Sequence, residues 1–445
     1  MAKFILHIDV NSAYLSWIAA YKLQQGELLD IRTVPSIIGG SEKSRHGIVL
    51  AKSILAKKFG IKTGESLMEA RQKCPNLLCV PPNYNLYIKA SNAIVEIIRE
   101  YSPKIQRFSI DECFVDYNDL ANGRQPIEVA EEIRARMSTE LGFTVNIGIS
   151  TNKILAIVAS DFQKPNRVHT LFPNEIREKM WPLPLGDLFM IGRRTEAKLL
   201  NLGFRTIGEL AQTDSTILYN HLKSHVYLVQ AYANGLDSSP VRKSNYEIIK
   251  GMRNSTTIHF DIHKRDDANL ILMSLAESVG IRLRQSGFCA GLIAISIRST
   301  EFTGGTHQRK ISVCTDSTTY LHRIAMELFD EYWDLAPIRK LGLRVSDLYT
   351  NDYVHLSLLE GFYFDMQKLL DDTVDTIRSK YGSDAIHRAS FLHSGLSPVT
   401  GGVQNDGEDN YPLMTSILYG KELRNNNNKK SVFLILLGAR IFYYY

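Results

Sequence analysis

The most regular alternation of hydrophobic and polar residues lies at positions 143–150. Every second side chain is apolar, namely Phe143, Val145, Ile147 and Ile149. A period of two places these side chains on one face of a β-strand and the residues between them on the other. The pattern therefore predicts a strand whose apolar face packs on helices and whose polar face can line a site.

A second alternating run lies at residues 4–9. One face carries apolar side chains for a core, namely Phe4, Leu6 and Ile8. The opposite face carries Ile5, His7 and Asp9, so that Asp9 closes the predicted strand. Asn11 or Ser12 can then cap a helix with the apolar side chains Ala13, Tyr14, Trp17, Ile18 and Tyr21.

A third apolar run, residues 108–116, contains the adjacent carboxylates Asp111 and Glu112. The run predicts a strand, and burying two charges in it is unfavourable unless a cation compensates. A bound metal is the usual compensation. Because strict alternation turns Glu112 away from Asp111, we expect a turn or local distortion that brings both to one site.

Asp9 and the Asp111–Glu112 pair together form the candidate metal site. Asp9 stands at a strand end directly before a helix N-terminus, where a metal and a polyphosphate can lie side by side. Asp–Glu pairs in strand-like sequence also occur as solvated strand ends or salt-bridge partners. Spacing alone leaves both interpretations open.

The remaining periodicity predicts an α+β chain of several domains. Helical spacing at 84–101 and 127–141 joins the strands above in one α+β domain, and short amphipathic helices follow Trp181. A basic linker at 241–254 precedes strand 255–260, helix 267–285, strands 292–299 and 308–313, helix 319–333 and strand 340–348. This is the β-α-β-β-α-β order of a ferredoxin-like unit.

Four segments carry a family resemblance. They are HisIleAspValAsnSerAlaTyr at 7–14, AlaLysLysPheGlyIleLysThrGly at 56–64, PheSerIleAspGluCysPheValAsp at 108–116, and GlyIleSerThrAsnLys with AspPheGlnLysProAsn across 148–166. In order and setting they resemble the Y-family translesion DNA polymerases, of the bacterial UmuC or DinB type. The resemblance covers roughly residues 1–350.

The resemblance implies an α+β right-hand polymerase fold. The palm is expected at 1–175 with small fingers inserted at about 21–78, and a helix-hairpin-helix thumb at 176–240. A ferredoxin-like little finger that binds DNA is expected at 241–350. Residues 351–445 are expected to form a partly disordered C-terminal tail with a candidate clamp-docking peptide.

The same resemblance assigns roles at the active site. Asp9, Asp111 and Glu112 are the expected catalytic carboxylates, and with the Val10 carbonyl they are expected to bind two Mg²⁺ ions. The substrates would be primer-template DNA and deoxynucleoside triphosphates.

Five residues are expected at the nucleotide, namely Ser12, Ala13, Tyr14, Lys57 and Lys164. Tyr14 stands where the family has its steric gate against ribose, and the lysines stand where it contacts the triphosphate. A core tyrosine and a surface lysine are the ordinary alternatives for Tyr14 and Lys164. Ile54 replaces a Tyr of the DinB branch, with Ser53 as a substitute hydrogen-bond donor.

DNA contacts are expected in two places. Gly192 and Gly203 belong to the thumb hairpin, where Met190 replaces the usual first Gly. In the little finger, Ile293, Ile295 and Ile297 would face the helices, and Ala294, Ser296 and Arg298 would face DNA. Arg253, Ser255 and Arg309 would add phosphate contacts.

The segment 354–359 resembles a sliding-clamp docking motif through Leu356, Leu358 and Leu359. His355 and Leu359 depart from the motif, so an ordinary apolar patch is the alternative. A sliding clamp is accordingly a candidate partner.

Composition narrows the class further. The net charge is +5, and because residues 351–445 hold 9 Lys/Arg against 11 Asp/Glu, residues 1–350 carry +7, which suits a polyanionic partner. The five cysteines form no metal-binding pairs, and no signal peptide or membrane span is predicted, so we expect a cytoplasmic protein.

The apolar run at 431–445 matches nothing in the family, and an altered reading frame is the preferred explanation. The rival classes are another palm-fold nucleotide enzyme, such as a cyclase, and a non-catalytic DNA-binding relative.

Overall fold

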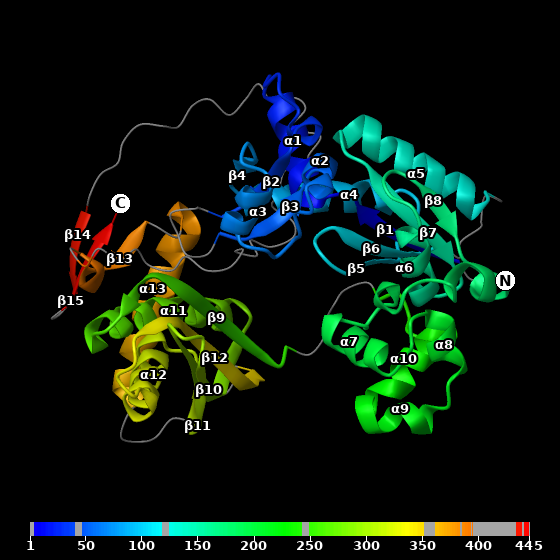
Figure 1. Ribbon diagram of the computed structural model, residues 1–445. Helices are drawn as coiled ribbons and strands as arrows, with labels where there is room; N and C mark the ends of the chain where they lie inside the picture. The colour runs from blue at the N-terminus through cyan, green and yellow to red at the C-terminus, as the bar shows by residue number, and fades with distance from the viewer. Residues whose placement is uncertain are drawn as a thin grey trace. The chain divides into compact units, whose positions relative to one another are not determined.

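The computed structural model describes residues 4–40, 47–117, 124–242, 249–350, 361–382, 385–392, 394, 433–437 and 440–444. These residues form two compact units (Figure 1). The first unit comprises the described residues up to 242, and the second unit comprises those from 249 onward. Each unit has its own hydrophobic core.

A five-stranded sheet organises the first unit, in the order β5-β6-β1-β7-β8. Its strands are β1 (Ile5–Val10), β5 (Ile105–Arg107), β6 (Glu112–Asp116), β7 (Val145–Ser150) and β8 (Val168–Thr170). The central strand β1 is antiparallel to both β6 and β7, and β8 is parallel to β7. Segments far apart in the sequence therefore meet at the end of β1.

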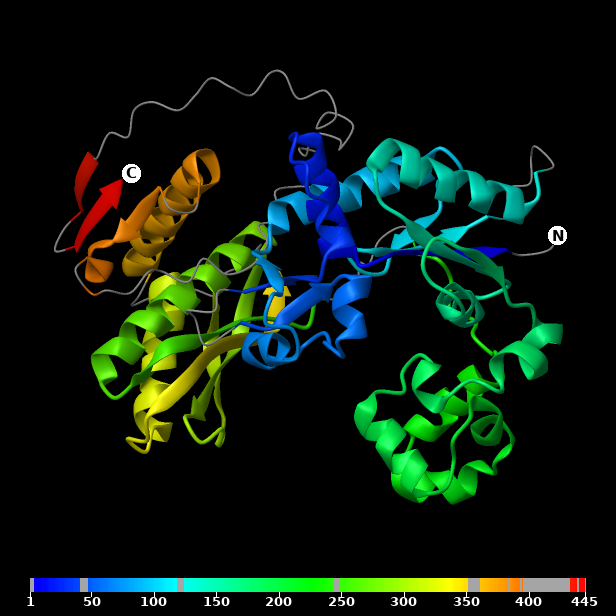
Figure 2. The ribbon, with the colours of Figure 1, turned by 45° about the horizontal axis from the view of Figure 1, so that its top comes forward.

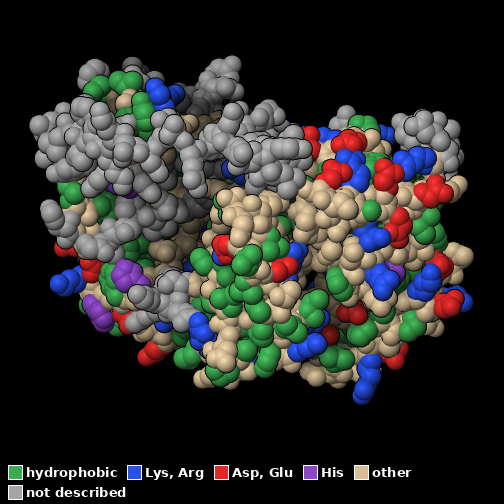
Figure 3. Space-filling model, turned by 90° about the horizontal axis from the view of Figure 1, so that it is seen from above, with side chains coloured by type: hydrophobic (Ala, Val, Ile, Leu, Met, Phe, Trp, Pro, Cys, Tyr) green, Lys and Arg blue, Asp and Glu red, His purple; other side chains and the backbone are tan. Residues whose placement is uncertain are grey.

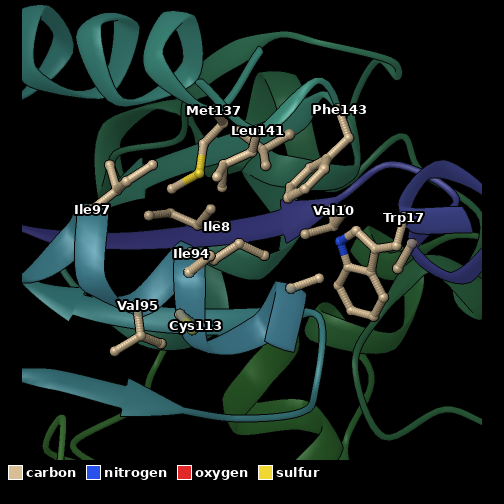
Figure 4. Packing of buried hydrophobic residues seen from close by; sticks show 14 of the residues in the cluster. Ile8, Val10, Trp17, Ile94, Val95, Ile97, Cys113, Met137, Leu141 and Phe143 are labelled. Carbon is tan, nitrogen blue, oxygen red and sulfur yellow. The ribbon is translucent and has the colours of Figure 1, made fainter. Parts of the chain in front are cut away.

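Helices cover both faces of this sheet. The helices on one face are α1 (Ala13–Gln24), α4 (Tyr84–Arg99) and α5 (Pro126–Leu141). Figure 4 shows Ile8, Trp17, Ile94, Met137 and Phe143 packed between them and β1. Helix α6 (Lys153–Asp161) covers the other face, where Ile5 packs on Phe114 and Ala156. The predicted division of β1 into two faces is confirmed.

The predicted strand 108–116 is wrong in its first half. Strand β6 begins only at Glu112, and residues 108–111 form the turn of a hairpin between β5 and β6. The backbone N–H groups of Phe108 and Ser109 donate to the Glu112 carbonyl, at 2.9 and 3.2 Å. The turn takes Asp111 out of the strand, which is the expected distortion.

A smaller sheet with its own core lies in the segment where the fingers are expected. Its strands are β2 (Ser36–Gly39), β3 (Val49–Lys52) and β4 (Leu78–Val80), in the order β3-β2-β4. The helices α2 (Ile54–Lys58) and α3 (Leu67–Lys73) pack on it.

Short helices lie in the segment where the thumb is expected, drawn in green in Figures 1 and 2. They are α7 (Arg193–Asn201), α8 (Ile207–Gln212), α9 (Ser215–Leu222) and α10 (His225–Ala233). Their core includes Leu199, Leu210, Leu218 and Val229. The predicted short amphipathic helices are confirmed.

The second unit has the predicted β-α-β-β-α-β order, with longer elements. They are β9 (Gly251–Ile262), α11 (Arg265–Gln285), β10 (Phe288–Ser299), β11 (Gly304–Thr315), α12 (Thr318–Tyr332) and β12 (Ile338–Thr350). The sheet order is β11-β10-β12-β9, and every neighbouring pair is antiparallel. Strands β9 and β10 are thus parallel with β12 between them, which is a split β-α-β arrangement.

A further helix, α13 (Gly361–Tyr381), packs on α11 in both ribbon views (Figures 1 and 2). Strand β13 (Ile386–Arg388) pairs with β15 (Arg440–Tyr444), which pairs with β14 (Phe433–Leu437). The candidate clamp-docking residues Leu356, Leu358 and Leu359 lie outside the described residues.

The surface of the first unit carries mixed charge. Figure 3 shows basic and acidic side chains side by side over the part that includes α5, where Arg134 pairs with Glu131 and Arg136 with Glu140. In the described part of the chain, no helix combines the length and the apolar character needed to cross a bilayer.

Candidate active site

The sheet register places Asp9 and Glu112 opposite each other. Asp9 lies near the end of β1, pairs with Glu112 of β6, and is only 8% exposed. Directly opposed residues of antiparallel strands share a face, and two like charges there destabilise each other. Burial, followed by the charges of Asp9 and Asp111, raises the pKa of Glu112 to about 7. Burial also raises the pKa of Asp9.

Asp111 reaches the same place through the hairpin turn. Its backbone carbonyl accepts a hydrogen bond from the Val10 N–H at 3.1 Å, directly after Asp9. Its carboxylate accepts a hydrogen bond from the Ser109 hydroxyl at 2.6 Å. The structure thus brings the three predicted carboxylates together from segments about a hundred residues apart.

Lys164 is the cation beside these carboxylates. Its ammonium group pairs with the Asp9 carboxylate and, at 2.7 Å, with Asp161 at the end of α6. Burial alone would lower the pKa of Lys164, but the neighbouring Asp9 and Asp161 charges raise it. Lys164 is therefore the counter-ion of Asp9.

The N-terminal turn of α1 borders the carboxylates. Ser12 is exposed with a φ of 49°, and its side chain makes no capping hydrogen bond, whereas Ala13 is buried. Tyr14 is half-buried and stacks on Tyr87, with ring centroids 4.3 Å apart. Burial, followed by the charge of Asp111, raises the pKa of Tyr14. The Tyr14 ring thus both packs on α4 and borders the site.

In the predicted fingers, Lys57 is exposed to solvent, whereas Ser53 has a structural role. Lys57 is exposed on α2, and no hydrogen bond or ion pair of the described residues joins it to Asp9 or Lys164. Ser53 is not a substitute phosphate ligand, because its hydroxyl donates to the Val34 carbonyl at 2.8 Å and accepts from the Ala56 N–H. It is the buried N-cap of α2.

The donor set suits a divalent cation that arrives with its substrate. Carboxylates and a backbone carbonyl are the oxygen ligands that Mg²⁺ prefers, and such sites commonly use one or two carboxylates plus substrate phosphates. Among the described residues, no group of three or more His, Cys, Asp or Glu side chains is placed so that it could hold a metal ion by itself. Asp9, Asp111, Glu112 and the Val10 carbonyl thus fit a partial metal site.

One face of the sheet in the second unit is basic. Register pairs Arg253 with Arg344, Ser255 with Gly342, and Arg298 with Lys340, so the three predicted residues share a face. Lys310 is exposed on the same face, opposite Leu292. Strand alternation applied to β11 and β12 would have identified the three residues that were missed, namely Lys310, Lys340 and Arg344. At the paired positions of this face, from 251–257, 292–298, 304–310 and 340–346, no carboxylate occurs.

The expected phosphate contact of Arg309 is wrong. Arg309 lies opposite Ile293, which faces the helices, and its guanidinium pairs with Glu327 at 2.5 Å and with Glu331. Because side chains alternate along β11, the neighbour Lys310 points to the basic face instead.

Gly192 and Gly203, the predicted DNA contacts of the thumb hairpin, lie at the two ends of helix α7. Gly192 is the exposed N-cap of α7, and Gly203 follows that helix with a φ of +94°. Met190 adopts a φ of +74°, which favours glycine. The tight turn is therefore made without the usual Gly.

A palm with carboxylates at the ends of its strands, together with separate units suited to phosphate binding, defines the class of right-hand polymerases. The chain belongs to the Y-family of DNA polymerases. The impB/mucB/samB family model matches residues 8–161, its C-terminal domain matches 249–358, and the family's helix-hairpin-helix motif matches 173–204.

Curated relatives match over most of their length. DNA polymerase IV of Clostridium acetobutylicum is 45% identical over 392 residues, covering 88% of this chain and 99% of the relative. DNA polymerase IV of Acetivibrio thermocellus is 37% identical, covering 90% and 100% respectively. DNA polymerase IV 1 of Bacillus subtilis is 31% identical, covering 90% and 96%.

A solved structure shares the fold. The Y-family DNA polymerase chimera Dbh-Dpo4(243-245)-Dbh superposes with a TM-score of 0.67 and 19% identity, covering 78% of this chain and all of that one. The predicted α+β right-hand fold, with palm, fingers, thumb and little finger, is confirmed. The domain boundaries at 175, 240 and 350 stay predictions.

Proposed function

We propose that this protein is a template-directed DNA polymerase that extends a primer during translesion synthesis in DNA repair. The primer 3′-hydroxyl attacks the α-phosphate of a deoxynucleoside triphosphate, a new P–O bond forms, and pyrophosphate leaves. The observation that carries the proposal is the meeting of Asp9, Asp111 and Glu112 at the end of β1. Phosphoryl transfer needs such positioning and charge neutralisation more than a covalent catalyst.

The cofactor in this proposal is a pair of Mg²⁺ ions. When bound, they activate the attacking oxygen and neutralise the charge of the leaving group. Asp9 and Asp111 would help to hold both ions, the Val10 carbonyl would add a ligand to the ion on the nucleotide side, and Glu112 would serve the ion beside the primer. The raised pKa of Glu112 supports this assignment, because crowded carboxylates are stabilised by a cation.

The nucleotide is proposed to lie along the N-terminal turn of α1. Tyr14 would pack beneath the sugar and exclude a 2′-hydroxyl, with Ser12 and Ala13 at the edge of the pocket. Lys57 and Lys164 would bind the triphosphate. The Lys164 ammonium group would leave the Asp9 carboxylate and bind the phosphates. This is possible because an incoming metal ion would neutralise the Asp9 carboxylate in its place.

DNA is proposed to bind the basic face of the little finger and the thumb hairpin. Arg253, Ser255 and Arg298 would contact phosphates without reading sequence, as would the backbone at Gly192 and Gly203. Leu356, Leu358 and Leu359 would dock a sliding clamp, and the protein would act in the cytoplasm.

Primer extension with Mg²⁺ tests the proposal. The wild type should extend an undamaged primer-template, and Asp111→Asn should abolish extension while DNA binding persists, because that affinity comes from phosphate contacts elsewhere. Glu178→Gln, an exposed thumb carboxylate, is the matched control. Near-normal extension by Asp111→Asn would contradict the metal assignment. A wild type that binds DNA without extending it would indicate a non-catalytic relative, and cyclic product from triphosphate alone would indicate a cyclase.

A further inference from the structure

Lys164 stands in an irregular segment, yet the backbone on both sides of it is fixed by one buried amide. The Nδ2 group of Asn146 donates to the Ser160 carbonyl at 2.9 Å and to the Gln163 carbonyl at 2.8 Å. Its Oδ1 atom accepts from the Arg167 N–H at 3.3 Å. Asn146 therefore holds the chain before and after Lys164.

A second amide extends this arrangement. Asn11 donates through Nδ2 to the Asn146 Oδ1 atom at 3.1 Å. The Asn11 Oδ1 atom accepts from the Asn166 N–H at 2.9 Å and from the Thr144 hydroxyl at 3.0 Å. The two linked side chains, Asn11 and Asn146, are called the amide clamp below.

Asn146 is unusual for its position. It lies within β7 and is completely buried, although Asn is disfavoured in strands and a buried amide must find partners for both N–H groups. The side-chain hydrogen bonds of Asn146 are made to the segment 160–167 and to Asn11. A purely apolar core would need none of them.

The clamp is also in register with the active site. Asn146 pairs directly with Asp9 across β1 and β7, so both side chains share one face of the sheet. The backbone around Lys164 is thereby fixed relative to Asp9, whose carboxylate pairs with the Lys164 ammonium group.

We propose that Asn146 and Asn11 are positioning residues. They hold the backbone of Lys164 in a place from which its ammonium group can leave Asp9 and bind the triphosphate. This inference rests on the proposed function, because it takes the triphosphate contact of Lys164 as its starting point. A clamp of this kind acts on nucleotide binding and leaves DNA affinity unchanged.

A double-mutant cycle in steady-state primer extension tests the inference. Asn146→Ala should raise KM for the nucleotide by about 10-fold, with a smaller change in kcat, because a displaced Lys164 no longer meets the phosphates. Asn11→Ala removes only one bond to the segment and should shift KM in the same direction. In a Lys164→Ala background, Asn146→Ala should change KM by less than about 2-fold, because residues that act through one contact are not additive.

Thr144→Val is the matched control, since it removes a hydrogen bond to Asn11 without touching the segment 160–167. Its KM should stay at the wild-type value, and DNA affinity by fluorescence anisotropy should be unchanged in every variant. The Asn11 side chain is only partly buried. If Asn146→Ala does not fold, Asn11→Ala can therefore be used for the same test.

The failures are distinguishable. Equal KM changes for Asn146→Ala with and without Lys164 would overturn the inference and leave the amides as packing residues. An unchanged KM in Lys164→Ala alone would overturn the triphosphate role of Lys164 and the clamp's function with it. A wild type without extension would overturn the proposed function itself.

Discussion

A buried carboxylate holds helix α13 on the little finger, and removing its charge should lower the free energy of unfolding. Glu277 of α11 accepts from Arg378 of α13 at 3.0 Å and from Arg388 of β13 at 2.6 Å. All three residues are less than 10% exposed. Arg378 also donates to the Ile386 carbonyl at 3.0 Å. One carboxylate thus links two later segments to α11.

Glu277→Gln keeps the shape of the side chain and removes its charge. The two guanidinium groups would then lose the charge of the buried carboxylate that they share, and breaking a buried ion pair in this way costs about 3–5 kcal/mol. Asp330→Asn is the matched control, because both oxygens of Asp330 accept hydrogen bonds from Arg265, as both oxygens of Glu277 accept from its two arginines, but the Arg265 and Asp330 side chains are 52% and 44% exposed. An exposed pair contributes only about 0.2–1 kcal/mol.

Hydrogen exchange of the full chain in increasing urea measures this difference. Peptides of α11 and β10 should lose protection at lower urea in Glu277→Gln, while peptides of the first unit serve as an internal reference. Asp330→Asn should leave the α11 peptides close to wild type. Equal and small losses in the two variants would refute the reasoning.

The pH dependence supplies a second check. Burial alone would raise the pKa of Glu277, but Arg378 and Arg388 lower it below the ordinary value of 4.5. Because the pKa of Glu277 is lower in the folded state, its charge contributes fully to the free energy of unfolding above about pH 4.5. This contribution is lost as the pH falls through the folded-state pKa. The difference between wild type and Glu277→Gln should therefore stay constant from pH 5 to 8. A difference that disappears between pH 7 and 5 would contradict the depressed pKa.

Three further predictions concern the nucleotide, the thumb and DNA. Tyr14→Ala should incorporate ribonucleotides more readily in single-nucleotide extension; an unchanged sugar preference with a loss of about 3–5 kcal/mol in unfolding free energy would make Tyr14 a core residue. Met190→Gly should raise thermal stability by up to about 1 kcal/mol, since relief of left-handed strain exceeds the entropy cost of Gly, and calorimetry that finds a loss would contradict this. Arg344→Ala should reduce the salt slope of DNA binding by about 0.9, whereas Arg309→Ala, paired on the helix side, should leave it unchanged.

The positions of the candidate carboxylates were predictable because each lies in a local pattern. Alternation in residues 4–9 determines the face of Asp9, and the central position of β1 then determines its neighbours. The hairpin before Glu112 was harder to predict, because its turn contains neither Gly nor Pro and continues the apolar run. Phe108 shows the reason. Its ring contacts those of Phe114 and Phe189, and it is 39% exposed, so this apolar residue belongs to a cluster of aromatic rings and not to a strand.

Contacts between distant segments carry no such local signal. Arg309 and Lys310 are adjacent cations, and only the register of β11 against β10 decides which of them pairs with α12 and which faces outward. The contacts of Asn146 with residues 160–167 depend in the same way on how α6 returns to β7. The type and spacing of charged residues can therefore identify the residues that a site needs. The hydrogen bonds that hold those residues in place depend on how the strands pair, and that pairing is visible only in the folded sheet.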